Sequence, residues 1–214
     1  MFLWFAVFLQ LSIPASGQTS ILDSLKKVEN RYNNIRTLQL DFEQTIFYTA
    51  QPSAKRTESG VLFLRKPGRM RWEYRKPAEK LFLSDGKDVY YYSSASNRVE
   101  KSKLKETDDM RAPLAFLIGR LDFQRDFREY RIKEEGANRW VTAIPKSTKA
   151  PYREVQFLLL SDSRIAQLRV LGHDQSVMDF YFRNETLNPS LKDALFVFQP
   201  PKGAEIVDIG EDRD

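Results

Sequence analysis

The residues of this chain that could do chemistry are few, and their spacing favours binding over catalysis. The sequence has 214 residues with one histidine and no cysteine, so neither a metal site nor a Cys-His pair can be completed. The histidine, His173, stands in Leu-Gly-His-Asp-Gln, which is typical of a solvated turn between strands. The 29 acidic residues are scattered, and no glycosidase-type pair stands out among them. The sequence therefore predicts no enzyme, no cofactor and no metal site.

A second group of reactive side chains is basic and alternates with large apolar residues. Between Arg69 and Arg75 the alternation is strict, and the apolar positions are Met70, Trp72 and Tyr74. This period of two is typical of a strand that is buried on one face only. Basic residues beside aromatics also occur where single-stranded nucleic acid binds. Here the arginines and the aromatics fall on opposite faces, so we predict an aromatic inner face, a solvated outer face and no nucleic-acid partner.

The elements that position this face are predicted to be antiparallel strands. Within residues 59–94, Pro67-Gly68 and Asp85-Gly86 are turn signals that reverse the chain. Before it, the spacing predicts an amphipathic helix from about Ser20 to Asn34, a long strand from Thr37 to Thr49 and a mobile hairpin loop from Gln51 to Glu58. After it, regularly spaced strands are predicted at 130–134, 139–144, 153–160, 164–171 and 177–183. This pattern favours a mainly β (α+β) fold, an unclosed and strongly curved antiparallel β-barrel with helices on its concave face.

The segment from Pro113 to Ile118 is apolar on every side of a helix and ends at Gly119. A surface helix has a wet face, so we predict that this one is a lid over the concave sheet. Together with the many large apolar residues on single strand faces, it favours a lipophilic cavity over an ordinary filled core. The predicted lid residues are Pro113, Leu114, Phe116, Leu117 and Ile118. The predicted cavity lining is Leu40, Phe42, Met70, Trp72, Tyr74, Phe180 and Phe182.

The first residues of the chain predict export. Residues 2–13 are an uncharged apolar run, followed by Pro14-Ala15-Ser16-Gly17. This order is typical of a secretory signal peptide covering residues 1–17, with cleavage before Gln18 and one domain over residues 18–214. A chain without cysteine has no disulfides and no thiol to be lipidated. The formal charge of +5, in an exported protein, favours anionic lipid or an acidic protein surface as the partner.

Taken in order, the motifs resemble the periplasmic outer-membrane lipoprotein carrier protein (LolA) family of Gram-negative bacteria. The resemblance runs over nearly all of the chain after the signal peptide. The motifs that carry it are Phe42-x-Gln44, Gly60-x-Leu62-x-Leu64, Lys66-Pro67-Gly68-Arg69-Met70-Arg71-Trp72-x-Tyr74, Ser84-Asp85-Gly86 before Tyr90, the helix from Pro113 to Ile118, and Phe198-x-Pro200-Pro201-x-Gly203.

The resemblance implies a periplasmic carrier, a chaperone for the acyl chains of lipoproteins that performs no chemistry. Its implied partners are acylated lipoproteins, an ATP-driven release complex in the inner membrane and, if the organism has one, an outer-membrane receptor; we expect a monomer. Members of the family usually have an arginine immediately before the proline that corresponds to Pro67. That arginine forms hydrogen bonds that hold the lid closed. Here that position is Lys66, preceded by Arg65, so these two are the candidate latch residues. In a regular strand Arg65 points to the opposite face, so the latch is either Lys66, which lacks the guanidinium fork, or absent. The alternative is an envelope lipid or lipoprotein sensor with the same half-barrel; such relatives usually carry a further domain.

Overall fold

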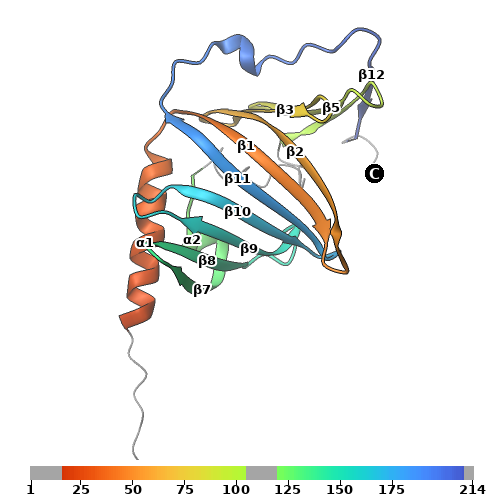
Figure 1. Cartoon of the computed structure of the whole chain (residues 1–214). Helices are drawn as coiled ribbons and strands as arrows, with labels where there is room; N and C mark the ends of the chain where they lie inside the picture. Colours follow the sequence, from red (N-terminus) through yellow and green to blue (C-terminus); the bar gives the residue numbers. More distant parts are fainter. Residues whose placement is uncertain (1–15, 105–119, 210–214) are drawn as a thin grey trace, which may run out of the picture.

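The computed structural model describes residues 16–104 and 120–209. Most of them form a 12-stranded sheet that curves strongly and stays open (Figure 1). Its strand order is β12-β6-β5-β4-β3-β2-β1-β11-β10-β9-β8-β7, and neighbours are antiparallel except for β12, which runs parallel to β6. The predicted mainly β fold with one open, curved antiparallel sheet is therefore confirmed.

The helices are α1 (Ser16–Asn33), α2 (Phe123–Asp126) and the 3-10 helix η3 (Asp193–Phe196). The strands are β1 (Thr37–Tyr48), β2 (Gln51–Arg65), β3 (Arg69–Lys76), β4 (Lys80–Asp85), β5 (Asp88–Ser93), β6 (Arg98–Lys103), β7 (Phe127–Glu135), β8 (Asn138–Pro145), β9 (Tyr152–Leu159), β10 (Ile165–Gly172), β11 (Ser176–Leu187) and β12 (Glu205–Asp208). In the described part of the chain, no helix is long and apolar enough to cross a membrane.

One prediction about the strands is wrong: the segment from Gln51 to Glu58 is not a loop. It is the first half of β2, and it pairs with β1 from Gln51 opposite Tyr48 to Glu58 opposite Gln44. The side chains from 51 to 57 are exposed, which explains the error. A polar composition records exposure to water, but it does not say whether the backbone is paired.

The two faces of the sheet are covered by different parts of the chain. The main buried cluster, which includes Leu62, Trp72 and Phe180, lies on the side that we call the concave face. Helix α1 lies across the ends of strands β8 to β10 (Figure 1) and contributes Leu25 and Val28 to the same cluster. Burial of each such side chain stabilises the fold by about 1.5–3 kcal/mol, so this cluster is the main source of stability.

The opposite, convex face carries a smaller buried set beneath the segment between β11 and β12. That segment arches over the β2 to β5 region before joining β6 as β12 (Figure 1). Phe196 of η3 is buried, and the ring of Phe198 stacks on Tyr90 with centroids 4.4 Å apart. Leu83, on the convex side of β4, is likewise fully buried. The C-terminal segment therefore replaces water over this part of the sheet.

Strands β2 and β3 approach each other closely at Gly60. The register of the two strands shifts between Ser59 and Gly60, which is the mark of a bulge. A Cβ atom built on Gly60 would lie 1.8 Å from the carbonyl oxygen of Glu73. Only glycine therefore fits at this position, because a side chain would collide with the backbone of β3.

Candidate functional site

The aromatic face predicted from the alternation in β3 is present on the concave side. Met70, Trp72 and Tyr74 are buried, whereas the residues between them are partly exposed. On β1 the same alternation buries Leu40 and Phe42. This arrangement follows because strands bury every second side chain when one face is dry.

Strand β11 adds the last two residues of the predicted lining. Phe180 is fully buried and Phe182 is partly buried against the same cluster. Their rings stack with centroids 6.2 Å apart. The structure thus brings the seven predicted lining residues, from β1, β3 and β11, to one face.

The rings form a continuous aromatic cluster across three strands. Phe42 contacts Trp72 edge-on at 5.2 Å and Tyr74 at 5.0 Å between ring centroids, and Trp72 meets Phe180 at 5.5 Å. Phe42 and Tyr74 lie on β1 and β3, with β2 between them. Both are in register with Gly60 of β2, so the two rings meet across this glycine.

A polar group that the sequence reading missed borders this cluster. We call Gln44, Arg56, Glu58 and Lys80 the polar rim. Gln44 and Glu58 are buried, and the two lie opposite each other in the β1–β2 register. Lys80 donates a hydrogen bond to Glu58, and the Nε atom of Arg56 lies 3.3 Å from the same carboxylate.

The polar rim is connected to the aromatic cluster through Tyr74. Its hydroxyl donates to the Oε1 atom of Gln44 over 2.8 Å, and the Nζ atom of Lys80 lies 5.7 Å from the Tyr74 ring centroid. In the sequence, Gln44 was noted as part of the Phe42-x-Gln44 motif. Sequence reasoning missed Glu58, because the false loop assignment hid that this residue alternates inward with Leu62 and Leu64.

Helix α1 is fixed to the sheet by a partly buried polar contact. The hydroxyl of Tyr32 donates to the Oε2 atom of Glu185 over 2.8 Å and accepts the backbone N–H of Ile165 over 3.0 Å. Arg31 forms an ion pair with the other oxygen of Glu185. Burial, followed by the charge of Glu185, raises the pKa of Tyr32, so its hydroxyl stays protonated and keeps donating.

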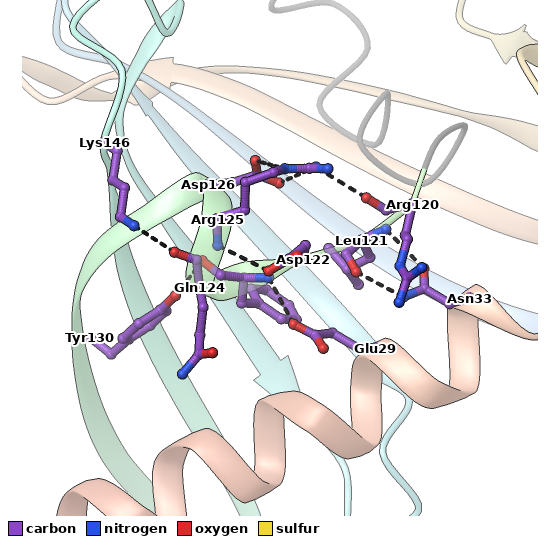
Figure 2. Close-up of polar contacts among 11 residues, drawn as sticks. Glu29, Asn33, Arg120, Leu121, Asp122, Gln124, Arg125, Asp126, Tyr130 and Lys146 are labelled. Carbon is purple, nitrogen blue, oxygen red and sulfur yellow. Dashed lines mark hydrogen bonds and ion pairs between the residues drawn. The ribbon is translucent and has the colours of Figure 1, made fainter.

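The same helix also holds the chain that follows residue 119. Asn33 donates to the carbonyl of Leu121 and accepts the N–H of Leu121, each over 2.8 Å (Figure 2). One turn earlier, the buried Glu29 accepts the N–H of Phe123 over 2.8 Å. The side chains of Glu29 and Asn33 share one helix face because they are four residues apart. Together they satisfy backbone groups of Leu121 and Phe123, just before and at the start of α2.

Further contacts extend this anchor to the sheet (Figure 2). Asp122 caps α2 by accepting the N–H of Arg125 over 2.9 Å, and Lys146 donates to the carbonyl of Gln124 over 2.7 Å. Tyr130 donates to the carbonyl of Phe123. Burial, with smaller contributions from nearby carboxylates, raises the pKa of Tyr130 to about 12, so it remains a donor at neutral pH.

Replacing Asn33 by alanine is expected to lower the free energy of unfolding by about 2 kcal/mol, because the N–H and the carbonyl of the buried Leu121 both lose their partner. Asn34→Ala is the matched control: its side chain is exposed, and a change within about 0.5 kcal/mol is expected. Urea unfolding measures both variants, and hydrogen exchange at the Leu121 amide should accelerate in Asn33→Ala only. Similar losses in the two variants would contradict the anchor.

The two candidate latch residues have different surroundings. The Nζ atom of Lys66 donates to the carbonyl of Tyr32 at the end of α1 over 2.7 Å, and burial lowers the pKa of this amine. Arg65 lies on the convex face, as the alternation predicted, where it pairs with Asp193 and stands 5.1 Å from the ring centroid of Phe196. Lys66 therefore contacts α1, whereas Arg65 secures the C-terminal segment.

The predicted lid, with Pro113, Leu114, Phe116, Leu117 and Ile118, lies outside the described residues.

His173 is an exposed turn residue, as predicted, and its Nε2 atom lies 3.0 Å from the carbonyl of Ala150. Across residues 16–104 and 120–209, no three His, Asp or Glu residues gather in a way that could hold a metal ion. What the described geometry offers is an extended apolar cluster on the concave face.

Comparison with known proteins gives agreeing results. The sequence model of the family described as "Outer membrane lipoprotein carrier protein LolA" matches residues 33–199. The outer-membrane lipoprotein carrier protein of Nitrosospira multiformis is 31% identical over 206 residues, covering 95% of this chain and 96% of that protein. The protein of the same name from Methylococcus capsulatus is 30% identical over 202 residues, covering 94% and 88%. A conserved protein of Thermus thermophilus shares the fold, with a TM-score of 0.55 at 14% identity over 88% of this chain and 99% of that one.

Proposed function

Because this chain belongs to the outer membrane lipoprotein carrier protein LolA family, we propose that it carries acylated lipoproteins from the inner to the outer membrane and does no chemistry on them. It accepts them from an ATP-driven release complex and delivers them to an outer-membrane receptor where one exists. Residues 1–17 direct export to the periplasm, and residues 18–214 act there as a monomeric carrier. The comparisons favour this function over the sensor alternative, because the relatives are named as carriers.

The observation that carries the proposal is the aromatic cluster on the concave face. Acyl chains gain about 0.8 kcal/mol for each methylene removed from water, so several chains need a large apolar surface. Phe42, Trp72 and Phe180 form such a surface from strands that are far apart in the sequence. The convex face of the same strands has mostly polar and charged side chains, so the acyl chains bind on the concave side.

Release is as important as binding, and burial of the cluster explains how both are achieved. Trp72 and Phe180 are already fully buried in the structure. Loading therefore exchanges contacts within the protein for contacts with acyl chains, and much of the gross gain cancels. Two states of similar free energy allow transfer in either direction, as a carrier needs. We propose that residues 113–118 act as the lid in this exchange and that Lys66 is its latch.

The experiment that tests the function is native mass spectrometry of the protein purified from its own periplasm. We expect a fraction of the mature chain to carry additional mass that dissociates into acylated peptide or protein. The matched control is the chain without residues 1–17, produced in the cytoplasm, which should carry none until it is mixed with a diacylglyceryl-cysteinyl peptide. If neither sample takes up acylated material, the carrier proposal is wrong.

A further inference from the structure

The concave face changes from apolar to polar as the strands run away from α1. Strand β1 begins just after α1, so its first residues lie closest to the helix. Starting from the α1 end, the inward positions are Leu38, Leu40, Phe42 and Gln44 on β1; Leu64, Leu62, Gly60 and Glu58 on β2; and Met70, Trp72 and Tyr74 on β3. The register places Tyr74 opposite Lys80 of the polar rim. A ligand with one apolar and one polar end therefore has a preferred direction on this face.

Trp72 stands at the boundary between the two regions, and its indole N–H is unsatisfied. The side chain is fully buried, and its Nε1 atom has no hydrogen-bond partner among residues 16–104 and 120–209. Buried polar groups in native proteins are nearly always paired, so an unpaired donor requires an explanation. Trp140 behaves normally by comparison, since its indole nitrogen donates to Glu135 at the surface.

The surroundings of Trp72 offer only weak acceptors. The rings of Phe42 and Phe180 meet Trp72 at interplanar angles of 74° and 62°. An N–H group directed at an aromatic ring forms a much weaker contact than one directed at a carbonyl. The nearest hydroxyl along the strand, that of Tyr74, is already directed to Gln44. A carbonyl oxygen that entered the apolar face would therefore find a donor without a competing strong acceptor.

We propose that the indole N–H of Trp72 donates a hydrogen bond to an acyl carbonyl of the cargo and thereby fixes the direction of the acyl chains. The hydrocarbon tails then extend toward Met70 and Leu38, and the glyceryl end faces the polar rim. This inference rests on the proposed carrier function. The carbonyl is that of an ester or of an amide, since both are neutral acceptors that an N–H group can satisfy.

The polar rim suits the other end of such a ligand. Lys80 is 17% exposed and Arg56 is 63% exposed, so the rim leads from the buried cluster to water. Gln44 uses its amide oxygen for Tyr74, which leaves its amide N–H groups to face a glyceryl or peptide oxygen. The peptide part of a lipoprotein can thus leave the protein at this end without burying unpaired polar groups.

The test compares ligands that differ only in the carbonyl. The first is a diacylglyceryl-cysteinyl peptide with two ester carbonyls, the second is its dialkyl ether analogue, and the third is the ether analogue with an N-acyl amide. The native protein is expected to bind the ester about five- to tenfold more tightly than the ether, which is the effect of one hydrogen bond in a dry site. If the ester binds no more tightly than the ether and only the N-acylated ether does, the carbonyl that Trp72 recognises is that of the amide.

Two variants assign the preference to Trp72. Trp72→Phe keeps an aromatic ring but has no N–H, so it should bind ester and ether within about twofold of each other. Trp140→Phe removes the indole on the outer side of β8 and should retain the native preference. In the native protein, the Trp72 indole N–H resonance should move downfield with the ester and stay in place with the ether. This NMR measurement decides the matter even if Trp72→Phe does not fold.

The outcomes separate the inference from the function on which it rests. If the native protein binds none of the three ligands, the carrier proposal itself is wrong. If it binds ester, ether and N-acylated ether equally, and the indole resonance is the same with all of them, the carrier function stands and the role of Trp72 is disproved. A preference that persists in Trp72→Phe would also disprove it.

Discussion

Replacing Phe182 by aspartate is expected to weaken binding of a diacylglyceryl-cysteinyl peptide by about 100-fold or more. Phe182 is only partly buried and stacks on Phe180 at the edge of the aromatic cluster, so the variant should still fold. With acyl chains against it, the new carboxylate would lose its water without gaining a partner, which costs several kcal/mol. Because each 1.4 kcal/mol is a factor of ten in affinity, the loss is at least about 100-fold.

The matched control is Tyr181→Asp, which makes the same change of charge one residue earlier on the convex side of β11. Its carboxylate stays in water, so affinity should remain within about threefold of the native value. Isothermal titration at neutral pH measures both variants, and circular dichroism verifies that they are folded. The loss in Phe182→Asp should shrink at acidic pH, since a protonated carboxyl is less costly to bury. Equal losses in the two variants would mean that the acyl chains do not bind on the concave face.

Replacing Gly60 by alanine is expected to lower the free energy of unfolding by about 3 kcal/mol or more. The added Cβ would lie 1.8 Å from the carbonyl oxygen of Glu73 and 2.9 Å from the Cα of Tyr74. Both are backbone atoms, so no side-chain rotation relieves the contact, and β2 and β3 must separate. The Phe42–Tyr74 contact that crosses Gly60 would be lost with them.

Gly136→Ala, in the turn between β7 and β8, serves as the control. A Cβ there meets nothing within 4 Å, and the remaining cost comes from the φ of +60°. This left-handed conformation costs an alanine about 1–2 kcal/mol. Urea unfolding gives both values, and acyl-peptide binding should fall in Gly60→Ala while Gly136→Ala binds normally. If Gly60→Ala were no less stable than Gly136→Ala, the close approach of β2 and β3 would not be a requirement of the fold.

Local periodicity was sufficient to predict much of the sheet. The alternation that contains Met70, Trp72 and Tyr74 identified the dry side of β3, because in a strand each side chain points opposite to its neighbour whatever the strand pairs with. The turn at Asp85-Gly86 was equally local, since Gly86 has a φ of +101° that other residues seldom adopt. Helix α1 was also predicted, although it begins earlier, at Ser16.

The same reasoning failed where a residue's role depends on a distant partner. The strand from Gln51 to Glu58 looks like a loop because its exposed side chains are polar, and only its pairing with β1 makes it a strand. The motif around Gly60 drew attention in the sequence, but the carbonyl of Glu73 that excludes a side chain there became known only from the β2–β3 register. Nothing near Asn33 in the sequence indicates that it bridges to Leu121.

The sequence by itself determined which faces of the strands are apolar and where the main turns lie, because these properties follow from residue type and short-range spacing. Only the tertiary structure decided that Phe42 and Tyr74 meet across a glycine, that a polar rim borders the aromatic cluster, and that the indole of Trp72 has no partner in the described part of the chain. Those facts depend on strand register and sheet curvature. Both are set by contacts between residues far apart in the chain, which no local pattern records.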